Sequence, residues 1–333
     1  MVVNKFIINF FKRGKQMIKK IKTLALISVL SFGVVGCSSS NNKKDNATYK
    51  ISLVLSEGGV NDQSFNQASW EGALKAKEKH KEIEVNYIES ETEADYFSNI
   101  ETVIDNDPDL IIGVGYKLTD AIKEASKIYP NQKFAIIDGD FKTIPKNVVN
   151  ITFDEEEAGY VVGLIASKMT KTNKVAFVGG YDIPSVTNFY KGYEKAIKEV
   201  NPSIKVLCQY ANSFTDASKG KTIAQKLIKD NYDIIFTAGG GVNNGVWEAC
   251  VENGKKAIGV DMPSSQFSKS IITSALKNVG TGVESTIKDL IDNNFQGGKV
   301  KVFDLSNGGV GYEKTNLIPQ DVIDFVEDKI KAN

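Results

Sequence analysis

The stretch Ser56-Glu-Gly-Gly-Val-Asn-Asp-Gln-Ser-Phe-Asn-Gln-Ala-Ser-Trp-Glu-Gly72 links two segments of different periodicity. An apolar run at 50–55 precedes it. A run with helical periodicity at 64–80 begins within it and continues beyond its end. The stretch is therefore predicted to be a polar turn between a β-strand and an α-helix. Gly58 and Gly59 allow this turn backbone conformations that are closed to other residues. Ligands of open α/β sheets bind beside such turns, at the carboxyl ends of the strands.

Polar and aromatic side chains of this turn are candidates for ligand contacts. Asn61 and Asp62 can cap the helix and can also reach a bound molecule. Phe65 and Trp70 are large apolar side chains in a polar neighbourhood. Capping and aromatic packing are also common in ordinary cores, so a capped helix whose aromatics face the core is the alternative.

Apolar runs of strand length alternate with helical-period runs along the chain that follows. Strands are predicted at 50–55, 84–88, 110–114, 133–137 and 148–153, and helices at 64–80, 95–106 and 118–129. This alternation predicts an α/β fold in which helices cover both faces of a parallel sheet.

The same plan then repeats. Strand-like runs recur at 174–178, 205–209, 233–237 and 256–260. A shift of 123 or 124 residues superposes the two halves, so that Phe65 falls on Phe189 and Asp138 falls on Asp261. The repeat predicts two α/β lobes of similar topology.

Four further elements complete the predicted organisation: helices at 154–170, at 283–294 and from Pro319 to the end, and a strand at 299–303. Lobe 1 is expected to comprise 49–152 and 277–303. Lobe 2 is expected to comprise 153–276 and 304–333.

The superposed residues predict a ligand site between the lobes. If the carboxyl ends of the two sets of strands face each other, Phe65 and Asp138 line one side of a cleft, and Phe189 and Asp261 line the other. Two aromatic faces suit a flat ring, and carboxylates accept hydrogen bonds from hydroxyl or ring N–H groups. Turn aspartates and core phenylalanines are the alternative.

The composition is that of an ordinary soluble globular protein. The 333 residues are 41% hydrophobic and 25% charged, and 41 basic residues balance 41 acidic ones, which gives no indication of a nucleic-acid partner. His80 is the only histidine and lies in a charged helix end, so neither a histidine metal site nor a catalytic triad can be built. We expect no metal, no cofactor and no enzymatic activity. Cys208 and Cys250 are predicted to be buried thiols, although a disulfide between them stays open.

Two motifs have structural explanations as well as functional ones. Gly239 to Gly245 follows a strand-like run but misses the spacing of a dinucleotide-binding loop by one residue. Its backbone N–H groups, including that of Gly240, can still face the cleft, although a flexible glycine turn explains the motif equally well. The run Glu155-Glu-Glu157 is best explained as acids that favour a helix N-terminus.

The amino terminus has the features of a secretory signal. A basic, acid-free region precedes the apolar run from Leu24 to Val35, and Val34-Val-Gly-Cys37 resembles a bacterial lipobox. We expect a signal peptide at 1–36, a lipidated Cys37 and a polar tether at 37–48, which together hold the protein on the extracytoplasmic face of the cell membrane. An ordinary signal peptide with an incidental cysteine is the alternative. Met17 would begin a more typical signal, so the true start is open.

Several motifs carry a resemblance that runs from about Lys50 to the end of the chain. They are Asn61 to Gln67 with Trp70 to Gly72, Phe153 to Gly163, Val178 to Gly180, Gly239 to Gly245, Ile258 to Asp261 and Thr273 to Lys277. With these motifs the chain resembles the basic membrane lipoproteins, also called the purine nucleoside receptor A group. These are solute-binding lipoproteins of ABC transporters, with two Rossmann-like lobes in the type I periplasmic-binding fold.

The resemblance implies a role for each candidate residue. Phe65 and Phe189 stack on the base, Asp138 reads its edge, and Asp261 and Lys277 hold the ribose. Asn61 and Asp62 form the polar entry loop. Trp247 stands where the family has a smaller aliphatic residue, so it is expected at the site and leaves the preferred nucleoside open.

The predicted function is therefore that of a lipid-anchored, monomeric binding protein for adenosine, guanosine or inosine. It would close two lobes around the ligand and deliver it to an ABC permease driven by an ATPase. A sugar or autoinducer receptor of the same fold is one alternative. A nucleoside hydrolase is another, although it would require an aspartate metal cluster or a catalytic histidine. A sensory partner of a membrane kinase also stays open.

Overall fold

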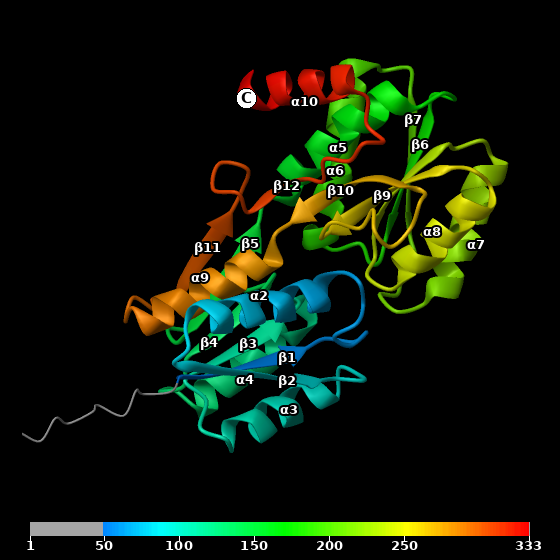
Figure 1. Ribbon diagram of the computed structural model, residues 1–333. Coiled ribbons are helices and arrows are strands. Elements are labelled where there is room, and N and C mark those ends of the chain that lie inside the picture. The colour runs from blue at the N-terminus through cyan, green and yellow to red at the C-terminus, as the bar shows by residue number, and fades with distance from the viewer. Residues whose placement is uncertain (1–48, 333) are drawn as a thin grey trace, which may run out of the picture. The chain divides into compact units, whose positions relative to one another are not determined.

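The computed structural model describes residues 49–332 of the chain, so the predicted signal peptide, Cys37 and the tether lie outside the described residues. The described chain forms two six-stranded sheets, each covered by helices (Figure 1). The strand orders are β11-β5-β4-β3-β1-β2 and β12-β10-β9-β8-β6-β7. The predicted α/β fold with two lobes is confirmed.

The first sheet and its helices make up what we call the first lobe. Its parallel strands are β1 (Tyr49–Leu55), β2 (Ile83–Glu89), β3 (Leu110–Val114), β4 (Phe134–Ile137), β5 (Val148–Phe153) and β11 (Lys299–Phe303). Its helices are α2 (Phe65–Lys79), α3 (Asp95–Ile104), the short 3-10 helix η1 (Tyr116–Leu118), α4 (Thr119–Ile128) and α9 (Val279–Ile291). Helices α2 and α9 cover one face of the sheet, and α3 and α4 cover the other (Figure 1).

The second sheet and its helices make up the second lobe. Its strands are β6 (Lys174–Gly179), β7 (Lys205–Tyr210), β8 (Ile234–Ala238), β9 (Lys256–Asp261), β10 (Ile271–Lys277) and β12 (Val310–Tyr312). Its helices are α5 (Glu155–Met169), α6 (Pro184–Val200), α7 (Ala217–Lys229), α8 (Val242–Glu252) and α10 (Gln320–Ala332). The unpredicted strand β12 runs antiparallel to β10, whereas the other pairings in this sheet are parallel.

Continuous apolar runs explain why these strands lie in the centre of the lobes. All five residues of β3 and all five of β8 are buried, as expected for parallel strands covered by helices on both faces. Helix α5 packs closely on α6 because Gly159 and Gly192 bring the two backbones together. A β-carbon on Gly192 would lie 1.9 Å from the carbonyl oxygen of Glu156, which no side chain could tolerate. This close packing fixes the first turn of α5, which borders the site.

The chain passes between the two sheets three times within the described residues. It does so between β5 and β6, between β10 and β11, and between β11 and β12. The lobe boundaries derived from the sequence stay a prediction, and each falls within one residue of the end of β5, β10 or β11.

Two smaller points concern the cysteines and the membrane. Cys208 on β7 and Cys250 on α8 are free thiols, so no disulfide joins them. Among the described helices, none combines the length and the apolar character that a membrane span requires.

Candidate functional site

A cavity that is partly open to solvent lies between the carboxyl ends of the strands of the two sheets. The first lobe contributes Ser56, Glu57, Asp62, Phe65, Asn66, Gly115, Tyr116, Lys117 and Asp138. The second lobe contributes Ile183, Ser185, Val186, Phe189, Phe214, Ala238, Gly239, Gly240, Val260, Asp261 and Lys277.

The polar turn after β1 forms one rim of this cavity. The Asp62 carboxylate accepts hydrogen bonds from the backbone N–H groups of Ser64 (2.9 Å), Asn66 (2.9 Å) and Gln67 (3.1 Å), so it caps α2. Burial raises the pKa of Asp62, and these backbone bonds oppose that rise. Asn61, by contrast, is exposed and does not line the cavity.

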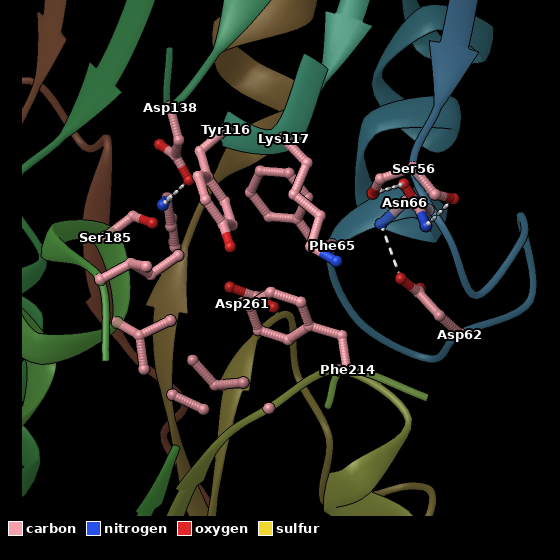
Figure 2. A pocket seen from close by; sticks show the side chains of 18 of the residues that line it. Ser56, Asp62, Phe65, Asn66, Tyr116, Lys117, Asp138, Ser185, Phe214 and Asp261 are labelled. Atoms are coloured by element: carbon pink, nitrogen blue, oxygen red, sulfur yellow. Dashed lines mark hydrogen bonds and ion pairs between the residues drawn. The ribbon is translucent and has the colours of Figure 1, made fainter. Parts of the chain in front are cut away.

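The side chain of Asn66 holds the same turn in place. Its amide donates to the backbone carbonyls of Ser56 (3.2 Å) and Glu57 (3.3 Å), and it accepts from the Ser56 hydroxyl (3.2 Å) (Figure 2). These bonds leave the turn well defined before any ligand enters, which lowers the entropy cost of binding.

Three phenylalanines line the cavity, but they do so differently. Phe65 begins α2, and Figure 2 shows its ring directed into the cavity, toward which Phe214 of the second lobe also points. Phe189 is only 2% exposed and packs edge-on against Phe236, with ring centroids 5.9 Å apart. Phe214 was missed by the sequence analysis. Its signal was available, because Phe214, like Phe65, is an aromatic residue in a polar stretch of sequence that follows a strand.

Asp138 and Asp261 occupy equivalent places in the two lobes. Asp138 directly follows β4, Asp261 ends β9, and their φ angles are +60° and +65°. This left-handed conformation is uncommon for residues other than glycine, and aspartate tolerates it better than most. Burial raises the pKa of Asp261 to about 6, although the charge of Lys277 opposes the rise. Asp261 also joins the lobes, because its Oδ2 accepts a hydrogen bond from the Ser64 hydroxyl.

Lys277, the last residue of β10, brings two carboxylates together beside the cavity. Its Nζ donates to Asp138 Oδ2 at 2.5 Å and to Glu155 Oε1 at 2.8 Å. It also lies 5.3 Å from the centroid of the Phe65 ring. Burial lowers the pKa of Lys277, but the negative charges of Asp138, Glu155 and Asp261 raise it by more, so the ammonium keeps its charge. The two residues assigned separately to base and ribose thus form one ion pair.

Trp247 does not belong to the site, and its predicted role is wrong. Its side chain is only 3% exposed and lies in the core between α8 and the second sheet. The indole Nε1 donates to the Thr237 hydroxyl at 3.2 Å, and the ring stacks on Phe267 with centroids 6.4 Å apart. The cavity is lined instead by Gly239 and Gly240, which precede α8. Trp247 lies one to two helical turns further on, on the face that packs on the sheet.

Lys117 spans the two lobes at another edge of the cavity. Its Nζ forms ion pairs with Glu93 (2.7 Å) and Glu57 (3.1 Å) of its own lobe. It also lies 5.0 Å from the ring centroid of Tyr181 in the second lobe. Tyr181 in turn packs edge-on against Phe214, with centroids 5.1 Å apart. A cation–π contact of this kind joins the lobes and supports one wall of the cavity. We refer to Lys117 and Tyr181 as the lobe clasp.

The charged groups at the site are arranged for binding rather than for holding a metal ion. Within residues 49–332, no group of three or more histidine, cysteine, aspartate or glutamate side chains is placed to hold one. The buried carboxylates surround an ammonium instead. Aromatic and apolar walls with a few polar side chains are typical of sites for small organic ligands.

Comparisons with known proteins agree with this description. Residues 49–332 match the family described as "ABC transporter substrate-binding protein PnrA-like". The CD4+ T-cell-stimulating antigen of Listeria monocytogenes is 37% identical over 342 residues, which cover 94% of this chain and 96% of that protein. The ABC transporter nucleoside-binding protein BmpA of Lactococcus lactis is 35% identical over 320 residues, 88% of this chain and 91% of that protein.

Solved structures show the same fold. A solute-binding protein of an ABC transporter system from Aeropyrum pernix superposes with a TM-score of 0.73 at 26% identity, covering 85% of this chain and 86% of its own. A myo-inositol binding protein from Caulobacter superposes with a TM-score of 0.63 at 14% identity, covering 85% and 98%, and this likeness is one of fold alone.

Proposed function

Because the chain belongs to the family of PnrA-like substrate-binding proteins of ABC transporters, we propose that it binds purine nucleosides between its two lobes for uptake. The resemblance found in the sequence is confirmed by this family assignment, which makes the chain a solute-binding protein and not an enzyme. The name of the Lactococcus lactis relative, a nucleoside-binding protein, supports the ligand class.

The observation that carries the proposal is the pair of aromatic rings directed into the cavity from opposite lobes. Phe65 and Phe214 both line the space in which a planar base would lie. A purine between two such rings gains stacking on both of its faces, which is worth roughly 1–3 kcal/mol per base for each aromatic. Phe189, which the sequence analysis proposed as the second stacking residue, would contribute an apolar edge to the same wall.

Polar groups at the end of this aromatic slot suit a ribose. Asp261 and Asp138 are acceptors for hydroxyl groups or for base N–H groups, and Lys277 is a donor. Two vicinal hydroxyls can donate to one carboxylate, which would match Asp261 to the sugar. The hydroxyl of Tyr116 also points toward this end of the cavity (Figure 2). We assign the base to the aromatic pair and the ribose to the charged groups.

A ligand screen tests this assignment. Purified protein is heated with adenosine, guanosine, inosine, the free bases, ribose and myo-inositol, and the melting temperature is compared with that of the ligand-free protein. A ligand present at a thousand times its Kd stabilises the fold by about 4 kcal/mol, which gives a clear shift. We expect shifts with nucleosides, smaller ones with bases and none with sugars. If a sugar raised the melting temperature and nucleosides did not, the protein would be a sugar receptor of the same fold rather than a nucleoside-binding protein.

We further propose that Cys37 carries a lipid and holds the protein on the extracytoplasmic face of the cell membrane. The sequence at 34–37 and the name of a relative 38% identical over 291 residues, basic membrane protein A of Borreliella afzelii, support this proposal. From there the protein would act as a monomer and deliver its ligand to a permease and ATPase of the same ABC system. The permease would recognise the closed, ligand-bound arrangement of the two lobes.

A further inference from the structure

The run Glu155, Glu156 and Glu157 has three different environments, although it reads in sequence as one acidic helix start. Glu155 is 4% exposed and its Oε1 accepts from Lys277 Nζ at 2.8 Å. Glu156 is exposed, and its carboxylate lies 4.0 Å from Lys195 Nζ. Glu157 Oε2 accepts from the backbone N–H of Leu305 at 2.8 Å. Capping of α5 does not need Glu155, because the carboxylate of Asp154 accepts from the backbone N–H of Glu157.

Two side chains of this run join the three places where the chain passes between the sheets. Glu155 follows β5 at the first passage, and its partner Lys277 ends β10 at the second. Glu157 binds Leu305, which follows β11 at the third passage. Any movement of one lobe against the other changes the backbone at these passages, so the geometry around Glu155 is tied to the arrangement of the lobes.

Lys277 connects Glu155 to the cavity. Its ammonium lies between Glu155 and Asp138, of which only Asp138 lines the cavity. A buried ammonium must stay paired, and its position is set by the carboxylates that share it. With one partner removed, the ammonium would be drawn onto the other, and Asp138 would have less capacity to accept a hydrogen bond from a ligand.

We propose that Glu155 is a positioning residue for the ligand site: it shares the Lys277 ammonium with Asp138 and so holds both groups where the ligand meets them. This inference rests on the proposed nucleoside site. It assigns Glu155 no ligand contact, because Glu155 does not line the cavity. Outer hydrogen bonds of this kind fix the rotamers of the groups that bind.

Acid provides a second way to remove the charge of Glu155. Burial raises the pKa of this carboxyl above the ordinary glutamate range; Lys277 opposes the rise and Asp138 adds to it. The other ionisable groups that face the cluster are Asp261 and, beyond it, Asp62. In the wild-type protein a falling pH therefore neutralises Glu155 and imitates its replacement by glutamine, in addition to protonating Asp261.

The test compares Glu155→Gln with Glu156→Gln, which makes the same chemical change one residue away on the exposed face. Inosine binding is measured by calorimetry from about pH 8 to about pH 5.5. At the upper pH we expect Glu155→Gln to weaken binding by roughly tenfold, comparable with the loss of an outer hydrogen bond that orients a metal ligand. Glu156→Gln should bind as the wild type does. The wild-type and Glu155→Gln affinities should converge as the pH falls.

A double variant shows whether Glu155 acts through Lys277. In a Lys277→Met background, Glu155→Gln should cause no further loss of affinity, because the group that it positions is absent. Equal affinities and parallel pH profiles for the wild type, Glu155→Gln and Glu156→Gln would overturn the proposal. A wild-type protein that binds no nucleoside would instead refute the proposed function.

A second substitution, to a shorter acidic side chain, is used if the Glu155→Gln variant does not fold. Circular dichroism identifies that case, and Glu155→Asp then replaces it, because aspartate keeps the charge but withdraws it by one methylene from Lys277. We expect Glu155→Asp to bind inosine several-fold more weakly than Glu156→Asp. Identical binding by these two folded variants would contradict the positioning role.

Discussion

At the scale of single residues, the backbone of Asp138 and Asp261 explains how two carboxylates come to face one cavity. A left-handed residue at the end of a strand turns the chain sharply at that point. The side chain then stays at the edge of the sheet instead of following the next loop outward. Asparagine adopts this conformation as readily as aspartate, so it removes the charge without disturbing the turn. This difference makes asparagine the informative substitution.

For Asp261→Asn we expect nucleoside affinity to fall by about ten- to a hundredfold, because a charged acceptor for a hydroxyl is lost. Calorimetry measures the loss, and free bases should be affected less than nucleosides because they lack the ribose. An equal loss for bases and nucleosides would place Asp261 at the base rather than at the ribose.

The same variant tests the titration of Asp261. The folded-state pKa of about 6 lies above the value of about 3.9 in an unfolded chain, so the folded protein holds this proton more tightly. Relative to Asp261→Asn, the free energy of unfolding of the ligand-free wild type should therefore fall by about 1–3 kcal/mol as the pH rises from about 4 to about 6. Urea titrations at several pH values give the comparison. A constant difference across this range would mean that the carboxyl is not perturbed.

Alanine substitutions at the three cavity phenylalanines should have different effects on ligand affinity and on stability. Phe65→Ala and Phe214→Ala should each weaken nucleoside binding by about ten- to a hundredfold, because each removes stacking on one face of the base. Phe189→Ala should mainly lower the free energy of unfolding, by about 3–5 kcal/mol, because it opens a void against Phe236. Calorimetry and urea denaturation measure the two quantities. If Phe214→Ala bound nucleosides with wild-type affinity, Phe189 rather than Phe214 would be the second stacking residue.

At the scale of elements, the lobe clasp is formed by two connecting segments, η1 and the loop between β6 and α6. Lys117 is held in its own lobe by Glu57 and Glu93, so its ammonium is already positioned when Tyr181 approaches. Burial lowers the pKa of Lys117, but the two carboxylates raise it by more, and the cation persists. If the lobes open and close as proposed, the contact is lost in the open form, and its energy would be gained on closure.

Tyr181→Leu should accelerate nucleoside dissociation by about two- to thirtyfold, since a cation–π contact is worth roughly 0.5–2 kcal/mol. The association rate should change less, because the open form lacks the contact. Stopped-flow mixing measures both rates. Tyr232→Leu is a matched control, because that tyrosine also lies near a lysine, Lys174, but both residues belong to the second lobe. Equal dissociation rates for the two variants would exclude a role of the clasp in ligand retention.

Elements with clear periodicity could be predicted from the sequence, whereas side-chain directions could not. The runs of β3 and β8 are short, mostly apolar and bounded by polar turns, which favours buried strands over helices. Strand β12 has only three residues, and it is a strand because it pairs with β10. Trp247 was misplaced because helical periodicity does not reveal whether an aromatic faces a cavity or a sheet. The Lys277 ion pairs join residues more than a hundred positions apart, which no local pattern encodes.

At the scale of the whole molecule, anchoring and ligand binding are predicted to be separable. Cys37→Ser should release the protein from the membrane fraction, because the acyl chains that hold it would be absent. Nucleoside affinity should not change, since the described residues that line the cavity begin at Ser56. Fractionation and mass spectrometry of the mature amino terminus provide the measurement. A variant that stays with the membrane, together with a wild type free of lipid, would refute the anchor.

The repeated passage of the chain between the sheets has a consequence for biosynthesis. Strand β11 completes the first sheet and β12 completes the second, and both come from the last part of the chain. A nascent chain that has emerged only as far as β10 therefore leaves β5 and β10 as open sheet edges at the same time. The first lobe therefore cannot finish folding before most of the second lobe has been synthesised, unlike a protein whose first domain is complete early. Open edges pair readily with foreign strands, so both halves would need protection by chaperones until β11 and β12 have been synthesised.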